Sequence, residues 1–251
     1  MQPQIDDWED FEVAVSLICA LYAAAAYLYA QDINVVSVDE KTGMQANEAI
    51  RPQLPTKPGR RKCVESEYKR HGVTCLTANK HVATGKVISP TMADTRTAED
   101  FVGHIARTVA SAPTQGWIFV LDNLNTHWSS ELCVWVENEL KLAIPLGVKG
   151  KSGILKNKES RQSFLSDPDH RIQFIYTPKH CSWLNQIEVW FSTLQRRVLR
   201  GASFESKEHL QQKVTAFIDQ YNERDAKPYK WTCKPEEVVE KVAKALYSAN
   251  T

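Results

Sequence analysis

The sequence predicts an α/β protein whose mixed sheet carries helices on both faces. Short β-branched and aromatic runs alternate with longer segments of helical period, a pattern typical of layered α/β domains. The 251 residues, 43% of them hydrophobic, are enough for one large domain with a substantial core. Two of the apolar runs end directly at a carboxylate, so we expect parallel strands whose carboxyl ends meet at a crevice.

Residues 13–30 form an uncharged, alanine-rich run that reaches the length of a membrane span. Acids precede this run where a signal peptide carries bases, and no stop-transfer charges follow it. A helix that is apolar on all sides also fits a protein interior. We therefore expect residues 1–33 to form a linker and a helix packed on the main domain, with no membrane partner.

Five strands are expected after this helix, at residues 34–39, 73–78, 86–89, 117–122 and 172–176. Helices are expected at residues 97–112, 129–142, 184–199, 206–222 and 235–247, with Thr95 or Thr97 and Ser206 as N-caps. These elements predict one domain over residues 34–225, followed by a C-terminal helix within residues 226–251.

Two polar segments interrupt this order. Residues 44–70, rich in proline and bases, are expected to form an exposed excursion. Residues 147–169 lack a convincing period and are expected to be an insertion that its glycines make flexible where it begins.

The net charge is only +1, but the charges are segregated along the chain. Residues 51–70 carry seven bases against two acids, and residues 149–161 carry five bases against one acid. Such runs can build a phosphate-binding face on a nearly neutral protein, although solvated loops explain each run equally well. The bases of the second run are Lys149, Lys151, Lys156, Lys158 and Arg161. The six cysteines are scattered without a CxxC pair, which favours a reducing cytoplasm.

The first two candidate functional carboxylates close predicted strands. Asp39 and Glu40 are adjacent, so they point to opposite faces of the strand, and we select Asp39 as the residue that faces the site. Asp122 closes the run WIFVLD, where a carboxylate is costly unless it binds a metal ion or hydrogen-bond donors. Asn123 and His127 follow it. His127 is a candidate to orient a phosphate or the attacking water, or else a structural histidine bonded to backbone.

The third carboxylate, Glu188, lies in a segment of helical period. It is about 100° from the apolar stripe of this helix, at the boundary of the core, and Asn185 is one turn before it. Lys179 and His180 precede the helix, and Arg196, Arg197 and Arg200 end it. A carboxylate among bases suits a metal ligand beside a phosphodiester, although a surface Glu paired with Arg fits the same spacing.

Carboxylates delivered to one point by two strand ends and a helix are suited to two-metal phosphoryl transfer. Magnesium prefers hard oxygen ligands and keeps several waters, so the protein supplies few ligands. The candidate catalytic and metal-binding set is Asp39, Asp122 and Glu188.

The segments VVSVDEKTGMQA, FVLDNLNTH and TPKHCSWLNQIEVWFSTLQRRVLRGASF resemble the three signature blocks of the insertion sequence 630 family, the bacterial branch of the mariner-like DDE transposases. The resemblance spans about residues 15–231. It implies a ribonuclease-H-like fold, metal ligation by Asp39, Asp122 and Glu188, and supporting positions at Asn123, His127 and Asn185. Members usually carry N-terminal helix-turn-helix domains, which we expect to be absent here.

The resemblance also implies cofactors and partners. Two Mg²⁺ ions, with Mn²⁺ as a substitute, would serve cleavage of DNA and strand transfer. Double-stranded DNA at the element ends and target would be the substrate, bound by a homodimer or together with a helix-turn-helix-bearing partner. The location would be cytoplasmic, at the bacterial nucleoid.

Three alternatives remain open. A resolvase or ribonuclease-H-like nuclease would keep the fold without strand transfer. A truncated, non-catalytic remnant would bind DNA or inhibit a full-length transposase. A glycosidase would need two carboxylates but would leave the basic runs unexplained.

Overall fold

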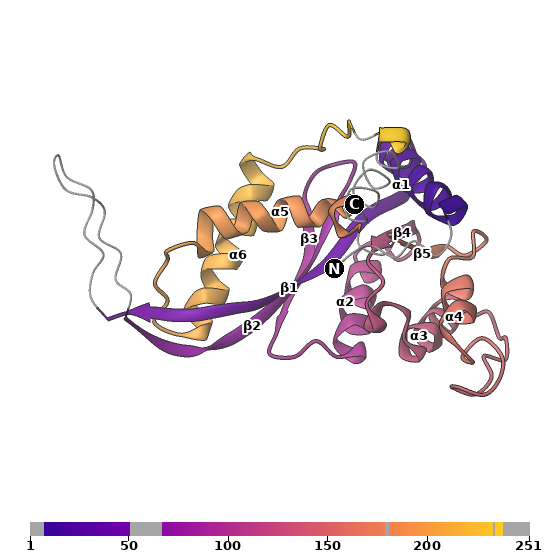
Figure 1. Cartoon of the computed structure of the whole chain (residues 1–251), viewed down its shortest axis with the longest axis horizontal. Helices are drawn as coiled ribbons and strands as arrows, with labels where there is room; N and C mark the ends of the chain where they lie inside the picture. The colour runs from indigo at the N-terminus through magenta and orange to yellow at the C-terminus, as the bar shows by residue number, and fades with distance from the viewer. Residues whose placement is uncertain (1–7, 51–66, 179–180, 233, 238–251) are drawn as a thin grey trace, which may run out of the picture.

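The computed structural model describes residues 8–50, 67–178, 181–232 and 234–237 (Figure 1). A five-stranded mixed sheet forms its centre, with the strand order β3-β2-β1-β4-β5. The strands are β1 (Ile33–Ala49), β2 (Tyr68–His81), β3 (Val87–Ala93), β4 (Gly116–Leu121) and β5 (Ile172–Tyr176). β1, β2 and β3 pair antiparallel, whereas β4 runs parallel to both β1 and β5. The predicted fold class is confirmed.

Helices cover both faces of this sheet. Successive side chains of β1 point to opposite faces, so this strand contributes to the core on each side. Val36 and Val38 belong to a core cluster with α2 (Ala98–Ala110), α3 (Ser130–Leu140) and α4 (Lys158–Leu165). Val35 faces the opposite side and packs with α1 (Trp8–Tyr29). α5 (Gln186–Leu194) and α6 (Lys207–Arg224) cover the remainder of that second face (Figure 1).

The prediction that residues 44–70 form an exposed excursion is wrong at both ends of this segment, which belong to strands β1 and β2. Residues 44–49 extend β1 and pair with β2 as far as Ala49, which lies opposite Tyr68. Met44 and Ala46 are buried against α5 and α6, while Gln45 between them is exposed. The contact with those helices, invisible in the local composition, keeps the chain extended here. The basic residues at 51–66 lie outside the described residues.

The insertion at residues 147–169 is more ordered than its composition predicts. Asn157 forms a capping box with Ser160 at the start of α4, and Phe164 and Leu165 enter the core. Gly147 adopts φ +85°, and a Cβ there would lie 2.2 Å from the carbonyl oxygen of Ser152. The insertion thus begins with a tight turn that requires a glycine at this position.

α1 is long and apolar enough by composition to cross a membrane, yet it packs on the sheet with one face. It begins at Trp8, earlier than the predicted residue 13. Phe11, Val15 and Ile18 are buried, whereas Val13 is 63% exposed and Tyr27 is 70% exposed. The helix therefore joins the core as expected, but burial on all its sides does not occur.

The remaining helices differ from prediction mainly at their ends. Thr97 caps α2 and Ser206 caps α6, as predicted. The predicted helix at 184–199 divides into a 3₁₀ turn, η2 (Ser182–Leu184), then α5, then a π-helical segment, η3 (Gln195–Leu199).

Residues 226–231, here called the C-terminal strap, run from the end of α6 to the side of α1. Trp231 packs edge-on against Tyr22 at 4.8 Å between ring centroids, and its indole donates to Cys19 Sγ. Residues 235–237 are helical where the C-terminal helix is predicted, and its predicted remainder to residue 247 lies outside the described residues.

Candidate active site

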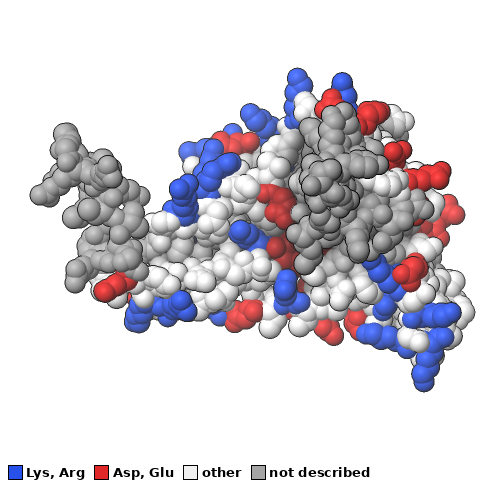
Figure 2. Space-filling model, in the orientation of Figure 1, with Lys and Arg blue, Asp and Glu red and all other residues white. Residues whose placement is uncertain are grey.

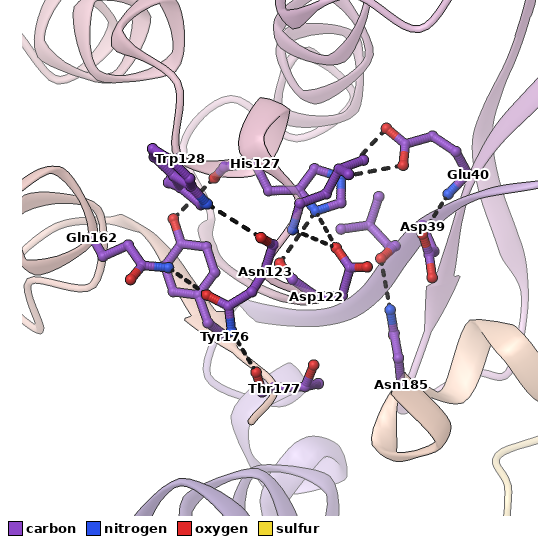
Figure 3. A network of polar contacts seen from close by, with 12 residues as sticks. Asp39, Glu40, Asp122, Asn123, His127, Trp128, Gln162, Tyr176, Thr177 and Asn185 are labelled. Carbon is purple, nitrogen blue, oxygen red and sulfur yellow. Dashed lines mark hydrogen bonds and ion pairs between the residues drawn. The ribbon is translucent and has the colours of Figure 1, made fainter. Parts of the chain in front are cut away.

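Asp39 and Asp122 lie at the carboxyl ends of the parallel pair formed by β1 and β4. The two strands pair as far as Ser37 and Val120, and β4 ends at Leu121, directly before Asp122. Asp39 is therefore located where β1 loses its β4 neighbour. Figure 3 shows Asp39 beside Asp122, and the His127 ring between Asp122 and Glu40. The two carboxylates therefore lie at the edge of the sheet where the sequence places the site, at the carboxyl ends of parallel strands.

The two carboxylates affect each other electrostatically. Burial, and then the charge of Asp122, raises the pKa of Asp39 to about 8. Burial also acts to raise the pKa of Asp122, but hydrogen bonding and the charge of His127 outweigh it and lower that pKa. Asp39 forms no ion pair within the part of the chain that the structure describes, so this pair of neighbouring acids is electrostatically suited to a divalent cation.

His127 is fully buried. Its ring lies between the carboxylates of Asp122 and Glu40 (Figure 3). Its Nδ1 lies 2.8 Å from Asp122 Oδ1, and its Nε2 lies 3.3 Å from Glu40. Burial acts to lower the pKa of His127, but the hydrogen bonds to Asp122 and Glu40 overcome it and raise the pKa to about 10. Nδ1 of the ring also lies 3.2 Å from the backbone carbonyl oxygen of Asp122, which is the contact expected of a structural histidine bonded to backbone. With no exposed surface, the ring cannot reach a phosphate or an attacking water, so that interpretation is wrong.

Asn123 connects the ends of several elements rather than facing the carboxylates. Its side chain donates to the Thr177 carbonyl after β5 at 2.7 Å and accepts from Gln162 of α4 at 2.8 Å. Its own carbonyl accepts from the Trp128 indole at 3.3 Å. Gln162 was not among the residues predicted from the sequence. Nothing in its local pattern indicates a contact with a loop thirty-nine residues away.

Asn185 fixes the start of α5 onto β1. Its side-chain Nδ2 donates to the backbone carbonyl of Val38 at 2.9 Å, and its side-chain Oδ1 accepts from the Ser37 hydroxyl. The same hydroxyl accepts from the Ile187 amide at 2.8 Å. These bonds place the first turn of α5, which carries Glu188, beside the strand residue that precedes Asp39.

Glu188 is half-buried at the core boundary, as its spacing predicts. Among the described residues, however, no three His, Cys, Asp or Glu side chains are grouped closely enough to hold a metal ion. The structure thus brings Asp39 and Asp122 together and places Glu188 on the adjoining helix, without closing a three-ligand cluster.

The candidate DNA-binding bases fall into two groups. In the first, Lys149, Lys151 and Lys156 are exposed, and Figure 2 shows basic side chains gathered at this corner of the molecule. Lys158 and Arg161 lie over the Trp128 ring, at 5.5 and 5.0 Å from its centroid. The second group, at the end of α5, contains the exposed residues Arg196, Arg197 and Arg200, of which Arg197 pairs with Asp225. Lys179 and His180 lie outside the described residues.

Residues 34–211, which include every one of these site elements, match the family model of the DDE superfamily endonucleases. The chain belongs to this family. No curated protein matches the chain significantly.

The fold of this DDE superfamily member is that of ribonuclease-H-like transposase catalytic domains. The chain is similar to Mos1 mariner transposase in its paired-end complex with Mn, with 14% identity and a TM-score of 0.56, over 99% of this chain and 64% of that one. It is similar to the isolated Mos1 catalytic domain with 12% identity and a TM-score of 0.51, over 99% and 96% of the two chains. The chain thus spans 64% of the length of the transposase in the paired-end complex.

Proposed function

We propose that this DDE superfamily chain is the catalytic part of a transposase of the insertion sequence 630 type. Its reaction would be metal-dependent cleavage of DNA phosphodiester bonds followed by strand transfer of a mobile element. The pair formed by buried Asp39 and partly exposed Asp122, at the ends of two parallel strands, carries this proposal. Burial and mutual repulsion raise the pKa of Asp39, and a divalent cation relieves both costs.

The side chains present fit Mg²⁺ or Mn²⁺, because carboxylate oxygens are the hard ligands that these ions prefer. Asp39 and Asp122 would hold the ions, with Glu188 as the third ligand from α5. The solved Mos1 paired-end complex with Mn is consistent with this choice of metal. A bound divalent ion activates an attacking oxygen and stabilises the leaving oxygen of a phosphodiester.

The other residues of the site hold these ligands in place and receive the DNA. Asn185 and Ser37 fix α5 against β1, and Asn123 holds the loop after β4. The exposed lysines at 149–156 lie within the segment that joins β4 to β5, so they can neutralise phosphates of a duplex bound near the crevice. Water as the nucleophile would give strand cleavage, and a 3′-hydroxyl would give strand transfer with the same ligands.

Magnesium-dependent nicking of supercoiled plasmid by the full chain tests the proposal. Asp39→Asn, Asp122→Asn and Glu188→Gln should each reduce nicking to the level of a metal-free control. Asp219→Asn, an exposed acid on α6, serves as the matched control and should nick normally. Near-normal nicking by a site variant would remove that residue from the ligand set.

Two further outcomes decide between this proposal and its alternatives. A wild-type chain that binds DNA but never nicks it with Mg²⁺ or Mn²⁺ would be a non-catalytic DNA-binding protein. Joining of a labelled 3′-hydroxyl oligonucleotide into plasmid would identify a transposase, whereas nicking without joining would identify a nuclease.

A further inference from the structure

Glu40 is a buried carboxylate that the proposed chemistry does not use. The alternation along β1 turns it away from Asp39, toward the face covered by α2, and its side chain is only 4% exposed. A carboxylate in such a place costs stability unless a cation or donors compensate it. Nε2 of His127 faces Glu40 here, at 3.3 Å from both carboxylate oxygens.

His127 is held rigidly, and each of its ring nitrogens faces an acid. Asp122 lies on the Nδ1 side and Glu40 on the Nε2 side. Ionised carboxylates accept hydrogen bonds without donating them, so each ring nitrogen that carries a proton can donate to the acid that faces it. Phe101 lies against the ring with 4.4 Å between ring centroids, and the Tyr176 hydroxyl donates to the His127 carbonyl at 2.9 Å. Packing and hydrogen bonds therefore fix the orientation of the imidazole.

The chain of contacts from Glu40 through His127 ends at one carboxylate oxygen of Asp122. Oδ1 of Asp122 lies 2.8 Å from His127 Nδ1 and accepts from the Leu124 amide at 2.9 Å. Both contacts use the same oxygen, which sets the rotation of the carboxylate and leaves Oδ2 for another ligand. The side chain of Asp122 is 35% exposed while that of His127 is fully buried, so the chain of contacts runs from the core toward the crevice.

We propose that Glu40 is a positioning residue, which orients Asp122 for metal binding through His127. This inference rests on the proposed function, because it assigns Asp122 to the metal. Carboxylates and histidines behind a metal ligand typically alter metal affinity or activity by about 10–100-fold when they are removed. Glu40 differs from a ligand in that its contribution passes entirely through the imidazole.

A double-mutant cycle on Mn²⁺ affinity tests this role in the full chain without DNA. Glu40→Ala should weaken Mn²⁺ binding, measured by electron paramagnetic resonance of the free ion, by about tenfold or more. Glu40→Gln, which keeps an acceptor for Nε2, should restore much of the affinity. In the His127→Asn background, Glu40→Ala should change the Mn²⁺ affinity no further, because the imidazole that links Glu40 to Asp122 is already absent.

The chain offers a matched control in Glu48 and His71, a second Glu–His pair between β1 and β2 with 2.8 Å between Nε2 and Oε2. Glu48→Ala and His71→Asn should leave Mn²⁺ affinity and plasmid nicking unchanged. Circular dichroism and melting temperature would show that each variant remains folded.

Nuclear magnetic resonance of the ¹⁵N-histidine-labelled, metal-free chain supplies a readout that does not depend on activity. The Nε2 resonance of His127 should shift in Glu40→Ala, because its contact with Glu40 is lost, and should not shift in Glu48→Ala. An unchanged Nε2 resonance in Glu40→Ala would overturn the inference. Unchanged Mn²⁺ affinity in Glu40→Ala, with wild-type binding intact, would overturn the positioning role alone. A wild-type chain that binds no Mn²⁺ would overturn the proposed function and the positioning role together.

Discussion

At the scale of single residues, Asp39 should cost the metal-free chain stability, because burial and Asp122 both disfavour its charge. Asp39→Asn removes the charge but keeps the shape of the side chain. We expect it to abolish nicking while the melting temperature in EDTA holds or rises, by about 2–4 °C for each kcal/mol gained. Thermal melts with and without EDTA measure this. A lower melting temperature in EDTA would show that the carboxylate stabilises the empty site.

His104 should make the fold sensitive to acid. It is fully buried near Thr91 Oγ1, at 3.0 Å, and burial followed by the charges of Arg107 and His127 lowers its pKa to about 3. The unfolded chain binds this proton near the ordinary value of about 6.5, so stability falls as the pH decreases below that value toward 3.

His104→Leu removes this titration from the folded and the unfolded state alike. Urea unfolding between about pH 7 and 5 should show a dependence on pH that is shallower by up to about 1.4 kcal/mol per pH unit than in wild type. The same slope in both proteins would exclude His104 as a source of acid sensitivity. His81, whose pKa burial lowers to about 4, keeps a part of the dependence in the variant.

The sequence predicts some features of the residue-level site and not others. That Asp39 and Glu40 face opposite sides follows from the period of two in a strand, and the structure shows it. The burial of His127 depends on Phe101 from α2 and Tyr176 from β5, which reach it only in the folded chain. For the same reason His127 could not be predicted as the partner of Glu40, since nothing in the sequence around Glu40 indicates which distant residue contacts it.

At the scale of elements, α4 supports the site through one hydrogen bond. Gln162→Leu removes the donor to Asn123, 2.8 Å away, and should lower the nicking rate severalfold while DNA affinity stays the same. Ser163→Ala, on the exposed side of the same helix, is the control. Nicking rates and DNA binding by fluorescence anisotropy separate the two effects. If Gln162→Leu and Ser163→Ala nick equally well, α4 does not position the loop after β4.

The loop before α4 should contribute to DNA binding. Replacing Lys149, Lys151, Lys156 and Lys158 with Gln should lower DNA affinity and flatten its salt dependence, by up to about 0.9 in slope for each phosphate that the variant no longer neutralises. Mn²⁺ affinity should barely change. Titrations at several salt concentrations measure the slope. An unaltered slope would mean that these lysines are simply solvated, consistent with the pairing of Lys149 with Glu131.

Elements were predictable where local pattern and tertiary contacts agree. The strand ending at Asp122 and the helix capped by Thr97 carry their own signals, an apolar run and a capping residue. The outer part of the β1–β2 hairpin carries a misleading signal, because the prolines and bases that follow from residue 51 hide the alternate burial of Met44 and Ala46. α4 is too short and polar for a visible period, and only Phe164 and Leu165 reach the core.

At the scale of the whole molecule, the C-terminal strap closes over the turn between β2 and β3. A Cβ on Gly85 would lie 2.0 Å from the carbonyl oxygen of Lys227, and the residue has φ +73°. Gly85→Ala should therefore destabilise the chain by about 1 kcal/mol for the backbone and by a further ~1–3 kcal/mol for displacement of the strap.

Gly43→Ala isolates the backbone cost of that substitution. Gly43 has φ +67° and nothing within 4 Å of its added Cβ, so only the first contribution applies. Urea unfolding of both variants gives the difference directly. Equal destabilisation of the two would show that the strap yields to the added methyl group without cost.

The parallel pairing of β1 with β4 also governs when the site can exist during synthesis. Ile33 pairs with Gly116, and α5 follows only after β5, so the site gathers segments from far apart in the chain. Such long-range pairing forms slowly, because loop closure costs entropy before the contacts repay it. A ribosome that adds about 5–20 residues per second needs about 7–30 s to proceed from Asp39 to Glu188. For all of that time the emerging polypeptide lacks the helix that carries Glu188, so the proposed three-carboxylate site cannot be complete.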